Sequence, residues 1–183
     1  MRPVALVPAT ERGGGLLRGG RDAPGATGAF LAAVLISCHD RRDSWVPRIG
    51  YAPQLGGVAP LLTPDEHFRL FGAATRMGVR KAQGTGRRLA SLLGWRPRRD
   101  IVASRLSGGT RQKLNVVLAE LDGPDLILLD EPYQGFDQDS YMIFRSQLLR
   151  WRDRGAGILM ITHMLHDLDD IDHVIELHPG EGV

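Results

Sequence analysis

The second half of the chain holds three short, mainly apolar runs with turn-forming or helical segments between them. Leu126–Leu129 and Gly157–Ile161 are the clearest, and His173–Leu177 is the third. Short runs without polar alternation are typical of strands that are buried on both faces of a parallel sheet. We therefore expect a strand at each of these three places.

Helical patterns lie between and before these runs. Thr63, followed by a proline and two acids, indicates a helix start, because a hydroxyl can cap the helix and the acids favour the positive end of its dipole. Further helices are expected over 85–93, 107–121 and 141–154. Strands that alternate with helices predict an α/β fold with a parallel sheet.

The first part of the chain has a different texture. Residues 1–28 are rich in glycine and show little periodicity apart from a short apolar run at Val4–Val7, so we expect a loop. Residues 29–36 suit either a buried helix or a strand.

Composition narrows the class of protein. The 183 residues are enough for one domain, and 43% hydrophobic with 24% charged residues is ordinary globular composition. A net charge of +2 does not argue for nucleic acid, and clusters such as Arg96–Arg99 are expected to be a solvated face. The single cysteine, Cys38, excludes an internal disulfide, and no apolar run approaches the roughly 20 residues of a membrane helix. We expect a soluble, intracellular chain that reaches a membrane only through a partner.

The most specific pattern is Leu106-Ser107-Gly108-Gly109-Thr110-Arg111-Gln112-Lys113. A serine and two glycines that open a helix present bare N–H groups and a hydroxyl at the positive end of a dipole, which is an arrangement that binds phosphate. The same three residues alone would indicate no more than a helix cap. The full eight residues resemble the signature motif of ABC-type ATPases.

Two carboxylates follow the first apolar run, in the sequence Leu126-Ile127-Leu128-Leu129-Asp130-Glu131-Pro132. Acids at the carboxyl end of a buried strand lie where ligands of parallel sheets bind. In its place after the signature, this stretch resembles a Walker B motif. The resemblance implies that Asp130 holds Mg²⁺ and that Glu131 polarises the attacking water.

Three further residues extend the resemblance in the family's order. Gln54, after Ile49-Gly50-Tyr51-Ala52-Pro53, is similar to the glutamine of the Q-loop, which contacts Mg²⁺ and the water. Asp137 is similar to the aspartate of the D-loop at the dimer interface, although Gly135-Phe136 before it is a variant. His163, after the run Gly157–Ile161, is similar to the switch histidine that contacts the γ-phosphate.

The resemblance implies a P-loop NTPase (RecA-like) fold, with a parallel sheet core, a helical signature subdomain and an N-terminal β subdomain that is largely missing. The whole of 1–183 would be one ATP-binding domain of an ABC transporter. Within it, 1–54 would hold the phosphate loop and the Q-loop, 55–121 the helical subdomain with the signature, and 122–183 the Walker B, D-loop and switch-histidine core.

The phosphate loop departs from the family pattern of glycine, four residues, then Gly-Lys-Ser/Thr. Its best match is Gly20-Arg21-Asp22-Ala23-Pro24-Gly25-Ala26-Thr27, with Ala26 at the lysine position. Gly20, Gly25 and Thr27 would then contact the phosphates, with Thr27 also on Mg²⁺. Losing the lysine removes a charge partner of the β- and γ-phosphates, so weak ATP binding is expected.

The function implied is that of an ATPase subunit that works as a homo- or heterodimer and couples ATP hydrolysis to transport, in the export direction, through a membrane-spanning permease. ATP and Mg²⁺ are the implied cofactors, and the cytoplasmic face of the plasma membrane the implied location. An alternative is a non-hydrolysing cassette whose Ser107–Gly109 completes a partner's site. A soluble ABC-type protein that acts on ribosomes or DNA is disfavoured, because there is no second cassette and no coiled-coil insertion before Ser107. No nucleic-acid partner is expected.

Overall fold

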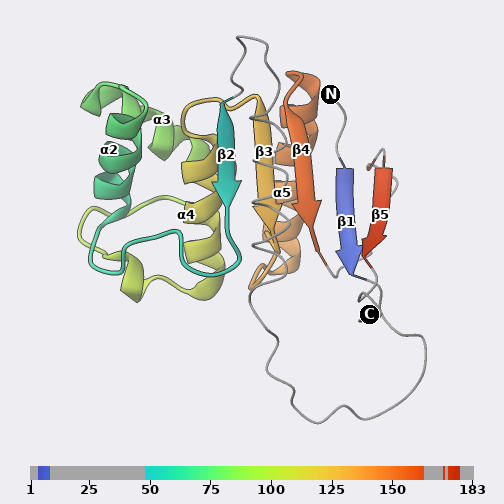
Figure 1. Cartoon of the computed structure of the whole chain (residues 1–183). Helices are drawn as coiled ribbons and strands as arrows, with labels where there is room; N and C mark the ends of the chain where they lie inside the picture. The colour runs from blue at the N-terminus through green and yellow to red at the C-terminus, as the bar shows by residue number, and fades with distance from the viewer. Residues whose placement is uncertain (1–3, 9–47, 163–170, 172, 178–183) are drawn as a thin grey trace, which may run out of the picture.

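The computed structural model describes residues 4–8, 48–162, 171 and 173–177. Its five strands are β1 (Val4–Pro8), β2 (Ile49–Ala52), β3 (Leu126–Asp130), β4 (Gly157–Ile161) and β5 (His173–Leu177). They form one sheet in the order β2-β3-β4-β1-β5, and every pairing is parallel (Figure 1). The strands predicted at the three apolar runs are confirmed, and β3 and β4 are neighbours as their shared pattern suggests.

Strand β1 corrects the expectation that residues 1–28 form only loop. Val4 to Leu6 pair with β4, and Val4 to Pro8 pair with β5, so β1 is an interior strand of the sheet. A strand flanked on both sides needs only a few apolar residues. The run was too short to stand out beside the glycines that follow it. The predicted lack of an N-terminal β subdomain concerns residues that mostly lie outside the described ranges.

The helices are α2 (Pro64–Ala74), α3 (Val79–Leu92), α4 (Gly108–Glu120) and α5 (Gln138–Asp153), with a 3₁₀ turn at Ala103–Arg105. Thr63 caps α2 in a capping box, in which its backbone N–H donates to the Glu66 carboxylate at 2.7 Å. Helix α3 begins at Val79, well before the expected position 85. Gly84 and Gly86, near its middle, obscure its periodicity in the sequence. Helix α5 begins at Gln138 because Asp137 caps it.

Helix α4 is the centre of the packing. It lies against β2, with α2 and α3 on its other side, whereas α5 packs against β4 (Figure 1). Its residues from Leu114 to Glu120 are all buried, together with Ile127, Leu129, Phe144 and Trp151 of the neighbouring elements. The core therefore joins the helical residues 55–121, which contain no strand, to the sheet.

A buried acid links α4 to α5. Glu120 is 5% exposed and accepts hydrogen bonds from Gln147 at 3.1 and 3.2 Å and from Arg154 at 3.2 Å. Burial nonetheless raises the pKa of Glu120, and the charge and hydrogen bonds of Arg154 and Gln147 offset only part of that effect.

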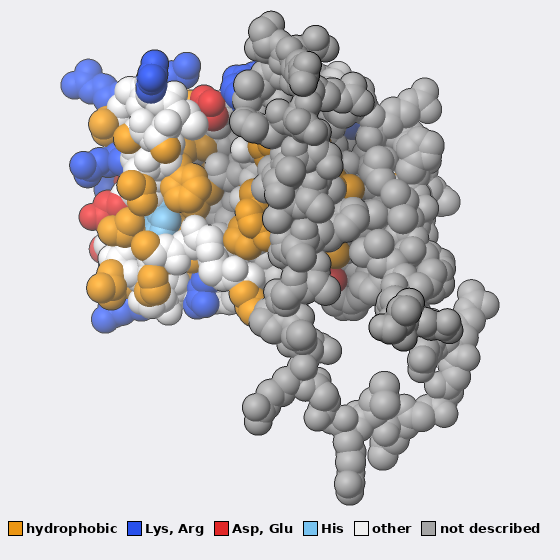
Figure 2. All heavy atoms as spheres, viewed as in Figure 1, with side chains coloured by type: hydrophobic (Ala, Val, Ile, Leu, Met, Phe, Trp, Pro, Cys, Tyr) orange, Lys and Arg blue, Asp and Glu red, His pale blue; other side chains and the backbone are white. Residues whose placement is uncertain are grey.

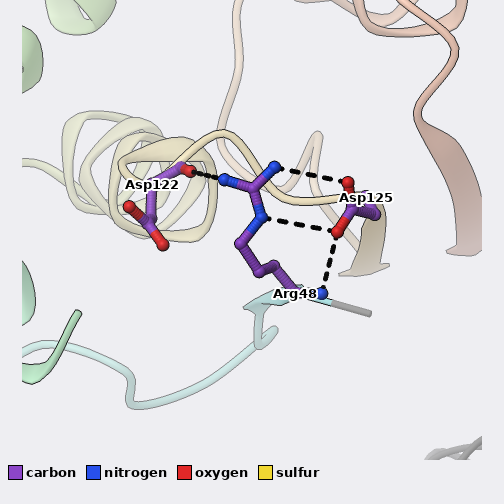
Figure 3. A network of polar contacts seen from close by, with 3 residues as sticks. All are labelled: Arg48, Asp122 and Asp125. Atoms are coloured by element: carbon purple, nitrogen blue, oxygen red, sulfur yellow. Dashed lines mark hydrogen bonds and ion pairs between the residues drawn. The ribbon is translucent and has the colours of Figure 1, made fainter. Parts of the chain in front are cut away.

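An exposed ion pair aligns the starts of β2 and β3. Arg48 donates from its backbone and guanidinium to the Asp125 carboxylate at 3.0 to 3.4 Å, and from Nη1 to the carbonyl of Asp122 at 3.0 Å (Figure 3). The hydrogen bond from Arg48 lowers the pKa of Asp125. With their amino ends held together, the two strands also end together, at the edge of the sheet that carries the candidate site.

Candidate functional site

The candidate site begins where β2, β3 and β4 end. Ala52 pairs with Leu129, and Asp130 pairs with Ile161, so the three strands stop at one edge of the sheet. Asp130 is the last residue of β3 and is 9% exposed.

Two groups around Asp130 affect its charge. Burial, then the neighbouring charge of Glu131, raise the pKa of Asp130, whereas a hydrogen bond from the backbone N–H of Gln54 opposes the rise. Asp130 and Gln54 are thus brought together, as parallel strands predict. A divalent cation would relieve the repulsion between the two adjacent carboxylates.

The carboxylates at this edge are compatible with Mg²⁺. Within the described residues, no three His, Cys, Asp or Glu side chains lie close enough together to hold a metal ion on their own. Mg²⁺ is commonly bound by one or two protein carboxylates, with phosphate and water supplying its other oxygen ligands. The carboxylate of Asp130 fits that role.

Glu131 has a backbone conformation that non-glycine residues seldom adopt, with φ at 46°. Its N–H donates to the carbonyl of Ile161 at 2.9 Å, and its own carbonyl accepts from the N–H of Gln134 at 3.2 Å. These two bonds hold Glu131 between the end of β4 and the turn that follows β3. Strained backbone of this kind clusters at functional sites.

A second group of residues lies at the start of α4. The Ser107 hydroxyl caps the helix by accepting from the N–H of Thr110 at 3.2 Å. Gly108 and Gly109 are the first residues of the helix, so their N–H groups have no partner within it. Ser107 and Gly108 are exposed, which leaves this end of the helix dipole open to an anion.

The turn after β3 packs directly on this helix start. A Cβ added to Gly109 would lie 2.2 Å from the carbonyl oxygen of Gly135, whose φ is 77°. Phe136 continues the contact: its ring lies 5.7 Å from the Nζ of Lys113 on α4 and packs edge-to-face on Phe144 of α5. The turn is therefore clamped between the two helices.

Asp137 ends this turn and caps α5. Its carboxylate accepts from the N–H of Ser140 at 2.8 Å, and hydrogen bonds from Ser140 lower the pKa of Asp137. The side chain is exposed, so it is anchored at one end while remaining accessible.

Sequence reasoning missed two amide side chains that connect these groups. Gln112 and Asn115, both buried on α4, donate to the carbonyl of Pro53 at 3.4 Å, and Asn115 also donates to Gly56 at 3.3 Å. The signal was present, because two amides one turn apart interrupt an otherwise apolar helix face. They hold the segment that carries Gln54 against α4.

Gln54, Gly108 and Gly135 consequently line one small hollow of about 160 Å³. The structure thus brings Gln54 close both to Asp130 and to the start of α4. His163, Gly20, Gly25 and Thr27 lie outside the described residues; His163 directly follows Thr162, which is fully buried after the end of β4.

The arrangement defines a nucleotide-binding cassette: a parallel sheet with paired acids at its carboxyl edge and a glycine-led helix beside them. The profile of the ABC transporter family matches residues 26–134, which is more than half of the chain. The chain belongs to the ABC transporter family.

Similar proteins of known name agree with this assignment. Human ATP-binding cassette sub-family A member 10 is 28% identical over 152 residues, which cover 81% of this chain and 10% of that protein. The human phospholipid-transporting ATPase ABCA7 is 30% identical over 140 residues, which cover 75% of this chain and 6% of that protein. Nod factor export ATP-binding protein I of Bradyrhizobium diazoefficiens is 28% identical, covering 73% and 44%. The chain thus spans less than half the length of each of these relatives.

Solved structures show the same fold. A dimeric bacterial ABC transporter cassette superimposes with a TM-score of 0.73 at 17% identity, over 97% of this chain and 81% of that one. The ATP-binding subunit of an ABC transporter gives a TM-score of 0.72 at 22% identity, over 97% of this chain and 75% of that one. The predicted P-loop NTPase fold is confirmed. Among the described helices, none is both long and apolar enough to cross a bilayer.

Proposed function

We propose that this chain binds ATP with Mg²⁺, hydrolyses it, and acts as the ATP-binding subunit of a transporter. The observation that carries the proposal is the convergence of Asp130, Glu131 and Gln54 at the carboxyl edge of the sheet, beside the open start of α4. Family membership supports the same chemistry.

In this proposal each residue at the sheet edge has one task. Asp130 and the side chain of Gln54 hold Mg²⁺, which when bound neutralises charge on the phosphates. Glu131, fixed by its bonds to Ile161 and Gln134, orients a water and accepts its proton. His163, next along the chain after Thr162, contacts the γ-phosphate.

The start of α4 serves a second subunit. Ser107 and Gly108 are exposed at the start of the helix, and the first N–H groups of the helix have no partner within it, so this end suits the terminal phosphate of an ATP held mainly by another chain. Asp137, anchored on α5 but exposed, would lie at the same interface. The proposed parts of the domain remain 1–54 with the phosphate loop and Q-loop, 55–121 with the helical subdomain and signature, and 122–183 with the Walker B, D-loop and switch-histidine core.

The phosphate loop is the weak point of hydrolysis by this chain alone. A P-loop joins the end of a strand directly to a helix, but Gly20 lies twelve residues beyond Pro8, where β1 ends. Ala26 also stands where the family has lysine. These two observations favour a second candidate: a cassette that does not hydrolyse ATP and whose Ser107–Gly109 completes a partner's site.

Transport itself requires a membrane-spanning partner, which the chain would meet on the cytoplasmic face of the plasma membrane. The segment that carries Gln54 is the part of the chain proposed to contact this partner. Export is the proposed direction, because relatives are named for Nod factor export and for phospholipid transport. The ATP-binding partner is a second copy or a related subunit.

Two variants, compared with wild type, test these proposals. Wild type should hydrolyse ATP with Mg²⁺, and Glu131→Gln should lower turnover by about 10²–10⁴-fold without weakening ATP binding. Ala26→Lys should tighten ATP binding by roughly tenfold to a hundredfold if Gly20–Thr27 wraps the phosphates. Tight binding by wild type with no gain from the added lysine would mean that another segment binds them.

The two candidate functions give different results in the same assay. Hydrolysis that Glu131→Gln leaves unchanged would exclude the role of Glu131. The non-hydrolysing cassette would be favoured if wild type alone did not hydrolyse ATP. In that case hydrolysis should appear in a mixture with a catalytically competent relative, and Ser107→Ala should abolish it again.

A further inference from the structure

Charge is segregated between two parts of this chain. Residues 55–121, which contain α2, α3 and α4, carry twelve Lys and Arg but only four Asp and Glu, a net charge of +8. The remaining residues carry eleven Lys and Arg and seventeen Asp and Glu, a net charge of −6. The nearly neutral total of +2 conceals this asymmetry.

The four acids of residues 55–121 are all occupied by contacts within the chain. Asp65 forms an ion pair with Arg87, and Asp100 pairs with Arg98 at 3.3 Å. The Glu66 carboxylate accepts from Thr63, and Glu120 is buried against α5. These four acids therefore leave most of the positive charge of residues 55–121, here called the helical lobe, uncompensated.

Helix α3 displays this charge on one side. It contains no acid, and at about 100° per residue Arg80, Lys81 and Arg88 project within a third of its circumference. Ala82, Gly86, Leu89 and Ala90 are buried on the opposite side. Arg80, Lys81 and Arg88 are exposed and make no ion pair or hydrogen bond with the described part of the chain.

The outward side of α3 is also smooth. Exposed Gly84 and Ser91 lie between the cations. Figure 2 shows Lys and Arg side chains around the outer edge of the lobe formed by α2 and α3, with hydrophobic side chains between them. No aromatic side chain is found on the outward side of α3, so it lacks the stacking platform typical of single-stranded nucleic-acid sites.

We propose that the outward side of α3 docks on an anionic phospholipid surface. Lipid headgroups present a planar sheet of negative charge, and each Lys or Arg brought near it strengthens binding about fivefold. A row of unpaired cations on one side of a helix fits such a surface. A subunit of a transporter complex works within reach of one, and the contact would orient the lobe relative to the bilayer.

The test compares two variants that lose the same charge. The complete chain, without nucleotide, is sedimented with phosphatidylcholine vesicles that contain or lack phosphatidylglycerol, at low and high salt. Arg80→Gln with Arg88→Gln removes two cations from α3, and Arg150→Gln with Arg152→Gln removes two from the last turn of α5. Circular dichroism shows whether each variant is folded. Because no nucleotide is present, the result is independent of the proposed ATPase function.

The proposal predicts that wild type binds the anionic vesicles and that high salt abolishes this binding. The α3 variant should bind about twenty-five-fold more weakly, whereas the α5 variant should bind almost as well as wild type. Equal weakening by both variants would overturn it, because binding would then follow net charge alone. Absence of binding to anionic vesicles would also overturn it. So would tighter binding of polyglutamate or duplex DNA through the same α3 residues, since the partner would then be another polyanion.

Discussion

The contact between Gly109 and Gly135 gives a prediction with its own control one residue away. In Gly109→Ala the new Cβ would lie 2.2 Å from the carbonyl oxygen and 3.0 Å from the carbonyl carbon of Gly135. Non-bonded carbon and oxygen rarely approach closer than about 3.3 Å, so one backbone must move by about 1 Å. Neither yields easily, because one is the start of α4 and the other is a turn at positive φ.

Overpacking of this kind costs about 1–3 kcal/mol. For a chain of this size each kcal/mol lowers Tm by about 2–4 °C, so Gly109→Ala should unfold roughly 2–12 °C below wild type. A Cβ at Gly108 meets nothing within 4 Å. Gly108→Ala should therefore leave stability unchanged or raise it by up to about 1 kcal/mol, because alanine restricts the unfolded chain.

Thermal and urea unfolding of the two variants would measure the difference. Stability is the better readout than ATP turnover, since both glycines belong to the proposed phosphate-binding motif and either change can lower activity. If Gly109→Ala proved as stable as Gly108→Ala, the close approach of α4 to the turn after β3 would be refuted.

Three further predictions concern stability. Gly86→Ala should destabilise the chain by about 1–3 kcal/mol in urea unfolding, because its Cβ would lie 2.4 Å from the buried Phe68 ring, whereas Gly84→Ala, which meets nothing within 4 Å, should not. Thr63→Ala should lose about 1 kcal/mol in the same assay through loss of the α2 cap, and an unchanged midpoint would contradict that role. Since burial raises the pKa of Glu120, the folded state binds its proton more tightly than the unfolded chain does. The unfolding free energy of wild type should therefore fall relative to that of Glu120→Gln as pH rises above about 4, and parallel pH profiles would contradict this.

Local patterns sufficed for much of the fold. The buried strands β3 and β4 follow from uninterrupted apolar runs, β5 from a third, mostly apolar run, and α4 from its serine cap and its motif. The proximity of Asp130 and Gln54 follows from a general rule, because parallel strands end at a common edge.

Features that depend on tertiary contacts could not be predicted in this way. Strand β1 has too few residues to stand out, and it is stabilised by the two strands that flank it. The glycines of α3 looked unfavourable for a helix, but Gly86 is required where Phe68 packs. The meeting of Gly109 with Gly135 joins the start of α4 to a turn that is separate in sequence, and such a contact leaves no periodic signal.

The amide bonds from Gln112 and Asn115 to Pro53 and Gly56 have a consequence for exchanging parts between relatives. Asn115 supplies the donor for two carbonyls, and a Cβ at Gly57 would lie 2.4 Å from its Oδ1. The segment after β2 and the middle of α4 are therefore one unit for engineering, although about sixty residues separate them. A chimera that grafts a foreign segment at 53–57, to alter the proposed contact with a permease, should import the matching residues at 112 and 115. Otherwise the carbonyls of Pro53 and Gly56 would lose the amide donors that hold this segment on α4.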